Sequence, residues 1–388
     1  MLQPFRRRIR HESLLLIAVV ACLFLSGHGP LLGGERPESG ELQFDPRAEL
    51  LPSSTLGPFV RLKDGRILTV DDDATLVSSD EGKTWSEGTP IVPPGNPYEK
   101  NMKISPERAL LRLRDGTIVL AFMNINEQVF EWNQSKSDTE PGARLPTYVV
   151  RSLDEGQTWR DLQMLHEDYT GAIRDMIQTE SGAVVFTSMQ LKHDPGRHTV
   201  VTYNSRDSGK TWSRSNIIDL GGVGHHGGAT EGTLEQLRGG RLRMLIRTNW
   251  GRFWDAFSDD DGLSWRIIEP SNIEASSAPG LLKRISSGRL VLLWNRPFPE
   301  GETSYPLIGG DNQWSEVPVS NHRGELSMAF SNDDGKTWSP PVIIARKPGA
   351  SLAYPYLFEA EQGVLWVTTM QGGVRVRLRE ADFVDPAQ

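Results

Sequence analysis

The chain has 388 residues, a single cysteine and a net charge of −8 from 42 basic and 50 acidic residues. An acidic chain of this kind is not expected to take nucleic acid or an anionic membrane as its main partner. The lone Cys22 excludes disulfides within the chain and thiolate metal centres.

The first 33 residues are predicted to be a secretory signal. Four arginines precede an apolar run from Leu14 to Leu25, and small residues follow it. The run is short for a membrane span, and no later segment approaches one. Val20-Ala21-Cys22 resembles a bacterial lipobox, so anchoring through Cys22 is a less favoured alternative. Removing the four arginines and Glu12 takes the net charge from −8 to −11, and we expect a secreted or periplasmic protein.

Residues 34–388 contain six alternating apolar segments, each interrupted by a turn of two residues. Asp-Gly and Gly-Gly between alternating strands are strong signals for a β-hairpin. The turns are Asp64-Gly65, Asp115-Gly116, Ser181-Gly182, Gly239-Gly240, Ser287-Gly288 and Gln362-Gly363.

Five copies of an eight-residue word, S-x-D-x-G-x-[TS]-W, lie between these hairpins at 78–85, 152–159, 205–212, 258–265 and 331–338. In such a word the Asp can accept backbone N–H groups of a tight turn, and Gly supplies a positive φ. The Trp leaves the turn as an apolar plug with an indole N–H to bond locally. We therefore interpret the words as structural rather than catalytic.

Six hairpins and five words over about 350 residues give roughly 58 residues per unit, which suits a four-stranded propeller blade. We predict an all-β, six-bladed β-propeller that fills residues 34–388 as one domain. The order of strands puts the Gly turns and the words at one end. The long loops Asn124–Pro146 and Arg296–His322 fall at the other end, where function is expected.

Polar residues gather at this second end. Several arginines at one channel mouth need an anion to neutralise them, so we expect an acidic small molecule or sugar as ligand. No metal site and no organic cofactor are predicted. The candidates are Asp71, Asp72, Asp73, Glu107, Arg108, Arg174, Asp175, His225, His226, Glu231, Arg247, Asn249, Trp250, Asn295, Arg296, Arg323, Tyr354 and Tyr356.

Three segments carry a family resemblance: Glu231 to Leu234 followed by Leu245-Ile246-Arg247, Arg323 to Leu326 before the fifth word, and Ala353 to Leu357. With the repeated word, they resemble the sialidase (neuraminidase) superfamily, whose members are six-bladed propellers with such Asp boxes, or BNR repeats. The resemblance covers nearly all of residues 34–388 and implies a bacterial secreted sialidase-like protein.

The resemblance implies a retaining exo-α-sialidase with a tyrosine nucleophile. Sialic acid has a carboxylate beside its anomeric carbon, so a neutral Tyr avoids the repulsion that an Asp or Glu nucleophile would meet. Tyr354 would attack, Glu231 would take its proton, and an Asp of blade 1, taken as Asp72, would protonate the leaving oxygen. The substrate-binding residues would be Arg247, Arg323, Arg174 and Arg296.

One position departs from the family pattern. Where the family has a further arginine before blade 1, this chain has Leu56, and Arg47 or Arg174 are the available substitutes. Two alternatives therefore stay open: a non-catalytic propeller that binds acidic glycans, and a propeller glycosidase for a different sugar. We expect a monomer in each case.

Each candidate also has a simpler interpretation as a packing or surface residue. Arg323 could pair with Glu325 at the surface, and Arg247 could stack on Trp250. Tyr354 could be an ordinary strand aromatic. The Asp71 to Asp73 run could be a solvated hairpin tip.

Overall fold

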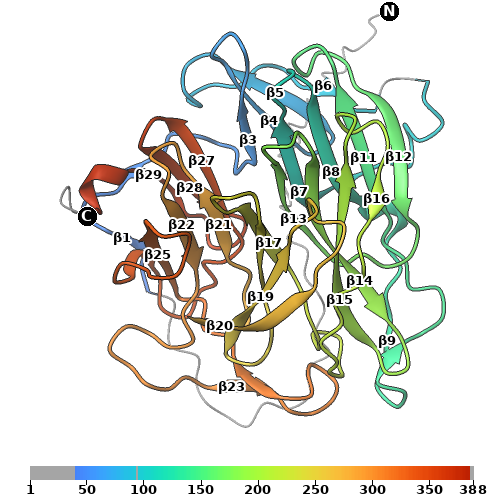
Figure 1. Cartoon of the computed structure of the whole chain (residues 1–388), viewed down its shortest axis with the longest axis vertical. Helices are drawn as coiled ribbons and strands as arrows, with labels where there is room; N and C mark the ends of the chain where they lie inside the picture. The colour runs from blue at the N-terminus through green and yellow to red at the C-terminus, as the bar shows by residue number, and fades with distance from the viewer. Residues whose placement is uncertain (1–39, 93–94, 385–388) are drawn as a thin grey trace, which may run out of the picture. The chain divides into compact units, whose positions relative to one another are not determined.

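In the computed structural model, residues 40–92 and 95–384 are described, so the predicted signal and Cys22 lie outside the described part. Within that part, antiparallel strands form six blades, and the prediction of an all-β six-bladed propeller is confirmed. Figure 1 shows the first strands of the blades, among them β7, β13, β17 and β21, near the middle of the molecule. Two 3₁₀ turns lie outside the sheets, η1 (Ile125–Glu127) and η2 (Glu380–Asp382).

Blades 1 to 3 follow one another directly in the sequence. Blade 1 contains β3 (Phe59–Arg61), β4 (Ile67–Asp71), β5 (Ala74–Ser78) and β6 (Thr89–Pro90). Blade 2 contains β7 (Ile104–Arg112), β8 (Ile118–Asn124), β11 (Thr147–Ser152) and β12 (Arg160–His166). Blade 3 contains β13 (Ile173–Gln178), β14 (Val184–Lys192), β15 (Arg197–Ser205) and β16 (Ser213–Arg214).

Blades 4 to 6 complete the propeller. Blades 5 and 6 each include one short strand from the start of the domain. Blade 4 contains β17 (Gly232–Gln236), β18 (Leu242–Ile246), β19 (Arg252–Ser258) and β20 (Ile267–Glu274). Blade 5 contains β21 (Leu281–Arg284), β22 (Leu290–Trp294), β25 (Glu325–Ser331), β26 (Val342–Arg346) and β1 (Gln43–Phe44). Blade 6 contains β27 (Pro355–Glu361), β28 (Val364–Thr369), β29 (Arg375–Arg379) and β2 (Glu49–Leu50).

The N-terminal strands β1 and β2 close the propeller. Gln43 pairs with Arg346 in β26, and Glu49 pairs with Arg377 in β29. Without β2, the edge of β29 would expose unpaired backbone groups. Sequence patterns missed this closure because each closing strand has only two residues and carries no alternation.

The core lies between the blades. Among the described residues, six clusters of buried apolar side chains each join two neighbouring blades. The sixth cluster contains Trp366 from blade 6 together with Phe59 and Ile67 from blade 1. Each blade is therefore buried on both faces, which matches the nearly continuous Val, Ile and Leu content of strands such as β8 and β22.

The Asp boxes are structural turns. In the first box, the Ser78 hydroxyl accepts the Gly82 N–H at 2.9 Å, and Asp80 accepts the N–H of Thr84 at 2.9 Å and its hydroxyl at 2.7 Å. Gly82 has a φ of +77°, which costs glycine little. The other four boxes repeat these bonds.

The box tryptophans differ from the local bonding that the sequence predicted. Trp212 does bond within its own box, to the carbonyl of Gly209 at 3.1 Å. Trp159 and Trp265 instead donate to threonine hydroxyls of the preceding blade, at 2.8 and 2.9 Å. Those threonines, Thr75 and Thr202, stand three residues before the box serine of their own blade.

Boxes and Gly turns lie at the same end of the propeller, as the strand order predicted. The second box, residues 152–159, contacts the Gly turn of blade 1, where the Glu155 carboxylate accepts the N–H of Lys63 at 3.1 Å. Ser208 of box 3 donates to Asp115 in the turn of blade 2 at 2.6 Å. At the other end the two long loops meet, where Trp132 donates to the side chain of Gln313 at 2.9 Å.

We expect Thr75→Val to lower the free energy of unfolding by about 1–3 kcal/mol, because it leaves the buried Trp159 indole N–H without an acceptor. Thr75→Ser keeps the oxygen and should lose less. Urea denaturation of the two variants measures the difference. Equal stability of Thr75→Val and the wild type would show that the inter-blade bond contributes nothing.

Candidate active site

Tyr354 lies directly before β27 in a strained backbone conformation. Its φ is +63°, in the left-handed region that a bulky residue rarely adopts. The conformation is held by Met370, whose N–H donates to the Tyr354 carbonyl at 3.1 Å, and by Arg174, which donates to the Pro355 carbonyl at 3.1 Å. Strain of about 1–3 kcal/mol at one residue is typical of functional sites.

The Tyr354 hydroxyl donates to Oε1 of Glu231 at 3.1 Å. Glu231 stands immediately before β17 and is only 6% exposed. These two residues come from blades 6 and 4, so the propeller brings together side chains that are 123 positions apart in the sequence.

Arg247 forms a buried ion pair with Glu231. Its Nη1 lies 3.0 Å from Oε1 and 2.9 Å from Oε2 of the carboxylate, and the guanidinium is 2% exposed. Burial by itself would raise the pKa of Glu231, but the positive charges of Arg247 and Arg174 outweigh it and lower this pKa. Glu231 is thus a carboxylate at neutral pH and can accept a proton.

The hydroxyl of Tyr354 is hard to ionise in the free protein. Burial first, and the negative charge of Glu231 second, raise the pKa of Tyr354 to about 12. Arg247 and Arg323 oppose the shift. The proton is therefore expected to leave Tyr354 only as the oxygen forms a new bond.

Two further arginines flank the Tyr354 ring. The Cζ of Arg174 lies 5.1 Å from the ring centroid, and that of Arg323 lies 5.7 Å from it. Arg323 donates to the Ser277 carbonyl at 2.6 Å and to the side chain of Gln371 at 3.3 Å. Neither arginine has a carboxylate within ion-pair distance among the described residues, and the Nε of each is buried without an acceptor.

The charge balance of this cluster is positive. Arg174, Arg247 and Arg323 carry three positive charges, and Glu231 and Glu107 are the acidic groups that act on Tyr354. Burial is the largest influence on Glu107 and raises its pKa, so this group tends to be neutral. A buried excess of positive charge favours binding of an anion.

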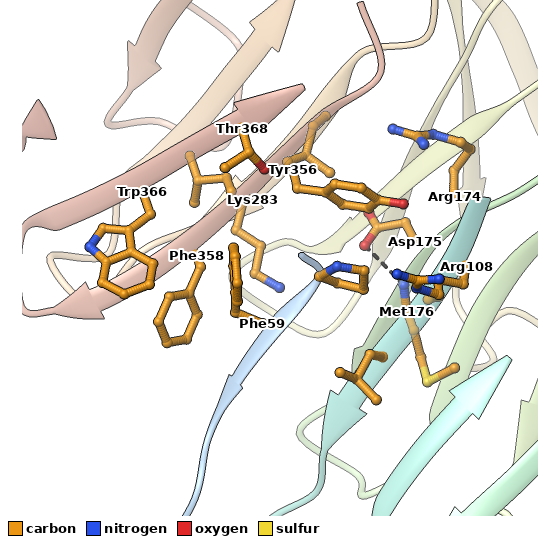
Figure 2. A pocket seen from close by; sticks show the side chains of 15 residues that line it. Phe59, Arg108, Arg174, Asp175, Met176, Lys283, Tyr356, Phe358, Trp366 and Thr368 are labelled. Carbon is orange, nitrogen blue, oxygen red and sulfur yellow. Dashed lines mark hydrogen bonds between the residues drawn. The ribbon is translucent and has the colours of Figure 1, made fainter. Parts of the chain in front are cut away.

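Arg174 is placed by an irregularity of β13. Ile173 pairs with Ser188, but Met176 pairs with Phe186, so β13 has one residue more than β14 over this stretch. Such a bulge redirects side chains at a strand end. Figure 2 shows Arg174 and Arg108 at one side of a channel cavity of about 60 Å³, with Tyr356 extending towards them.

Two predicted residues are not joined to this cluster. Asp72 is exposed at the β4–β5 tip, and no hydrogen bond or ion pair connects it to Tyr354, Glu231 or the three arginines in the described part of the chain. Arg296 faces two carboxylates instead, with Nη2 3.8 Å from Glu325 and 3.9 Å from Glu300.

Leu56 brings no charge to the site, and Arg47 does not supply the positive charge that is missing there. Leu56 uses its carbonyl to accept the hydroxyl of Thr368. Arg47 forms an ion pair with Asp45 at 2.8 Å and stacks over Phe383 at 4.1 Å. Of the two substitutes that the sequence offered, Arg174 alone lies against Tyr354.

The simpler interpretations of Arg247 and Arg323 do not describe this structure. Arg247 contacts Glu231 and Ser277, whereas Trp250 packs on Trp254 with ring centroids 5.7 Å apart. Glu325 is buried and bonds Arg346 at 2.8 Å instead of pairing with Arg323.

Sequence reasoning missed Ser277, which links two arginines. Its hydroxyl accepts Nη2 of Arg247 at 2.9 Å and donates to Asn249 at 2.7 Å, while its carbonyl accepts Arg323. No pattern in the loop marks Ser277, which follows Ser276. Among the candidates named from the sequence, Glu107 had no role assigned to it. Its position after Pro106, inside a mainly apolar strand, was the signal that could have marked it as functional.

The described residues contain no group of three or more His, Cys, Asp or Glu side chains that could hold a metal ion. None of the helices in this part is long and apolar enough to span a membrane.

A family model described as a BNR repeat-like domain matches residues 70–367. The chain belongs to this family. The sialidase of Vibrio cholerae serotype O1 is 22% identical over 215 residues, which cover 51% of this chain and 26% of that protein. The chain thus spans about a quarter of the length of this curated relative.

Solved structures share the fold of this BNR propeller. The Hadza microbial sialidase Hz136 has a TM-score of 0.57 and 17% identity, covering 84% of this chain and 65% of that one. A protein of unknown function from Dyadobacter fermentans has a TM-score of 0.55 and 17% identity, covering 88% and 97%. The chain therefore shares the propeller fold of these proteins.

We expect Arg247→Met to lower the free energy of unfolding by about 3–5 kcal/mol, because it leaves the buried Glu231 carboxylate unpaired. The loss should shrink in Arg247→Met/Glu231→Gln. Arg241→Met, which breaks the exposed pair with Asp259 in the same blade, should cost at most about 1 kcal/mol. Urea denaturation at pH 7 gives all three values.

The pair should also make stability depend on pH. Because the folded-state pKa of Glu231 is below its ordinary value of 4.5, the stabilisation is complete above that value and is lost as the pH falls further. An unchanged acid unfolding curve for Glu231→Gln would contradict this assignment.

Proposed function

We propose that this BNR propeller is a retaining glycoside hydrolase of the sialidase type that removes a terminal acidic sugar. Tyr354 is the nucleophile and Glu231 is its base. The observation that carries the proposal is the 3.1 Å hydrogen bond between the Tyr354 hydroxyl and a buried carboxylate that Arg247 keeps ionised. A residue that only packed in a strand would need neither the base nor the strained backbone.

The first step forms a covalent sugar–tyrosine intermediate. The Tyr354 oxygen bonds to the anomeric carbon while its proton passes to Glu231, and the bond to the leaving oxygen breaks. The leaving oxygen takes a proton from an acid of the site. In the second step water attacks the anomeric carbon and the bond between that carbon and the Tyr354 oxygen breaks. The acid's conjugate base takes the water proton, and Glu231 returns a proton to the Tyr354 oxygen.

The arginines suit a substrate that carries a carboxylate next to the anomeric carbon. Arg323 and Arg174 flank the nucleophile and lack an acidic partner in the described part of the chain, so a substrate carboxylate would neutralise them. A tyrosine, neutral until it reacts, also avoids the repulsion that an anionic nucleophile would meet. Both features favour sialic acid or a closely similar acidic sugar.

An acid must protonate the leaving oxygen, and Asp72 is the residue that the sequence predicted for it. Asp72 is exposed at the β4–β5 tip, next to Asp71 and Asp73. The carboxylate of Asp73 accepts the N–H of Ile104 at 2.7 Å. Glu107, which acts electrostatically on Tyr354, is the second candidate.

A second function is favoured by one observation: Leu56 stands where the family has a further arginine. With one cation fewer, the propeller could bind acidic glycans without cleaving them, or cleave a different acidic sugar. Binding without turnover would distinguish the first alternative, and activity on another sugar the second. From residues 1–33 we also propose that the protein acts outside the cytoplasm.

The proposal is tested by hydrolysis of an α-sialoside and by trapping. We expect Glu231→Gln to lower kcat/KM by about 100- to 10,000-fold, the range of general acid–base catalysis, and Tyr354→Phe to lower it at least as much. A sialosyl fluoride with a second fluorine on the neighbouring carbon should add one sugar mass to the peptide of Tyr354. Tyr98→Phe, at an exposed position, is the control.

No hydrolysis of any α-sialoside by the folded wild type would reject the sialidase assignment. Turnover that survives Tyr354→Phe, or a label on another residue, would reject Tyr354 as the nucleophile and leave the sialidase assignment standing.

We also expect Arg323→Met to lower kcat/KM for sialosides by about 10- to 150-fold, which corresponds to about 1.5–3 kcal/mol for a lost bond to a charged group. Arg66→Met removes an arginine whose partner Asp64 is on the opposite, Gly-turn end, and should change little. Equal kinetics for Arg323→Met and the wild type would show that Arg323 does not bind the substrate.

A further inference from the structure

Glu107 lies at a register shift in β7, the innermost strand of blade 2. This shift is larger than those in β13 and β27. In β7, Ile104 pairs with Asn124 and Arg108 pairs with Phe122, so four steps along β7 face two steps along β8. The two extra residues leave the ladder as a bulge around Pro106 and Glu107. Bulges next to active sites redirect side chains, and this one stands at the channel mouth of blade 2.

The bulge is fixed from two sides. The Ser105 hydroxyl donates to the Glu107 carbonyl at 2.5 Å and accepts the N–H of Met123 at 3.0 Å. From blade 6, the Tyr356 hydroxyl donates to the Pro106 carbonyl at 3.2 Å. Tyr356 is two residues after Tyr354. The start of β27 therefore both fixes the bulge and carries the nucleophile.

The Glu107 carboxyl group is close enough to the residues around Tyr354 to interact with them electrostatically. It interacts electrostatically with Arg174, Glu231, Arg247, Arg323, Tyr354 and Tyr169. Its Oε2 is buried and has no hydrogen-bond partner among residues 40–92 and 95–384. An unpartnered buried carboxyl oxygen at a reaction centre has spare capacity to bond a substrate atom.

We infer that Glu107 is the general acid and base of the reaction, the role that the sequence had assigned to Asp72. The inference rests on the proposed function. In the first step the Glu107 carboxyl group gives its proton to the leaving oxygen as the bond to the anomeric carbon breaks. In the second step the resulting Glu107 carboxylate takes a proton from the attacking water, and the acid form returns.

The surroundings give Glu107 the protonation state that an acid needs. Burial and the neighbouring Glu231 raise its pKa, while Arg174, Arg247 and Arg323 oppose the shift. Two carboxyl groups close together in a buried site do not both ionise easily, and Arg247 keeps Glu231 as the ionised one. Glu231 is thus the base towards Tyr354, and Glu107 holds the proton.

The test compares Glu107→Gln and Glu107→Ala with the wild type on two sialosides. One has an aryl leaving group that departs without a proton, and the other is sialyllactose, whose alkoxide must be protonated. We expect kcat/KM for sialyllactose to fall by about 100- to 10,000-fold and that for the aryl sialoside to fall far less. In both Glu107 variants, the fall of kcat/KM at alkaline pH should disappear, because in the wild type this fall reports loss of the Glu107 proton.

Azide supplies a second measurement. It attacks the intermediate without a base, so Glu107→Ala with the aryl sialoside should be accelerated by azide and release sialosyl azide. Glu107→Gln should also keep the wild-type affinity for free N-acetylneuraminic acid, which a misfolded site would lose. Glu269→Gln, an exposed glutamate of blade 4, is the control.

Three outcomes would count against the inference, and they are distinguishable. A wild type without sialosidase activity overturns the proposed function, and the role of Glu107 with it. An active enzyme whose Glu107 variants lose both substrates equally, keep the fall of kcat/KM at alkaline pH and do not respond to azide overturns the role of Glu107 alone. The same signatures in Asp72→Asn, and not in the Glu107 variants, would return the role to Asp72.

Discussion

The arrangement of the site depends on the buried ion pair between Arg247 and Glu231. The pair keeps a carboxylate ionised where water is excluded, and the carboxylate in turn holds the Tyr354 hydroxyl. Arg247 is itself held by Ser277, which also fixes Arg323 through its carbonyl. Removing either charge would leave the other buried and unpaired, so the whole cluster forms as one unit.

The propeller separates stability from chemistry. At one end, hydrogen bonds within the five boxes, and between boxes and the Gly turns of neighbouring blades, fix the backbone. At the other end, the inner strands of blades 2 and 3 contain bulges, and Tyr354 of blade 6 has a left-handed backbone. Irregular backbone is tolerated there because the regular clusters between the blades hold the strands in place.

Charge and burial divide the work between two glutamates of similar intrinsic acidity. Glu231 has Arg247 in contact with both carboxylate oxygens, whereas one oxygen of Glu107 has no hydrogen-bond partner within the described residues. The first environment favours the ionised form and the second the neutral form. In the mechanism that we propose, a base and an acid can therefore operate at the same pH, next to a tyrosine that ionises only as it reacts.

The amino-acid sequence by itself determined the repeat, the number of blades and the end at which polar residues meet. It could do so because box turns and two-residue hairpins are local structures, encoded by Ser, Asp, Gly and Trp at short spacing. The resemblance of three segments also named Glu231, Arg247, Arg323 and Tyr354, which the fold then brings together.

Only the tertiary structure decided which of the other candidates share a site with these four residues. Nothing local distinguishes Arg174, which lies against Tyr354, from Arg296, which lies against Glu325 and Glu300. The closure by β2 and the link through Ser277 each depend on contacts between segments far apart in the sequence, and the bulge that carries Glu107 is held from blade 6 by Tyr356. Strand register and bulges arise from the packing of neighbouring blades, and so they cannot be read from any single segment.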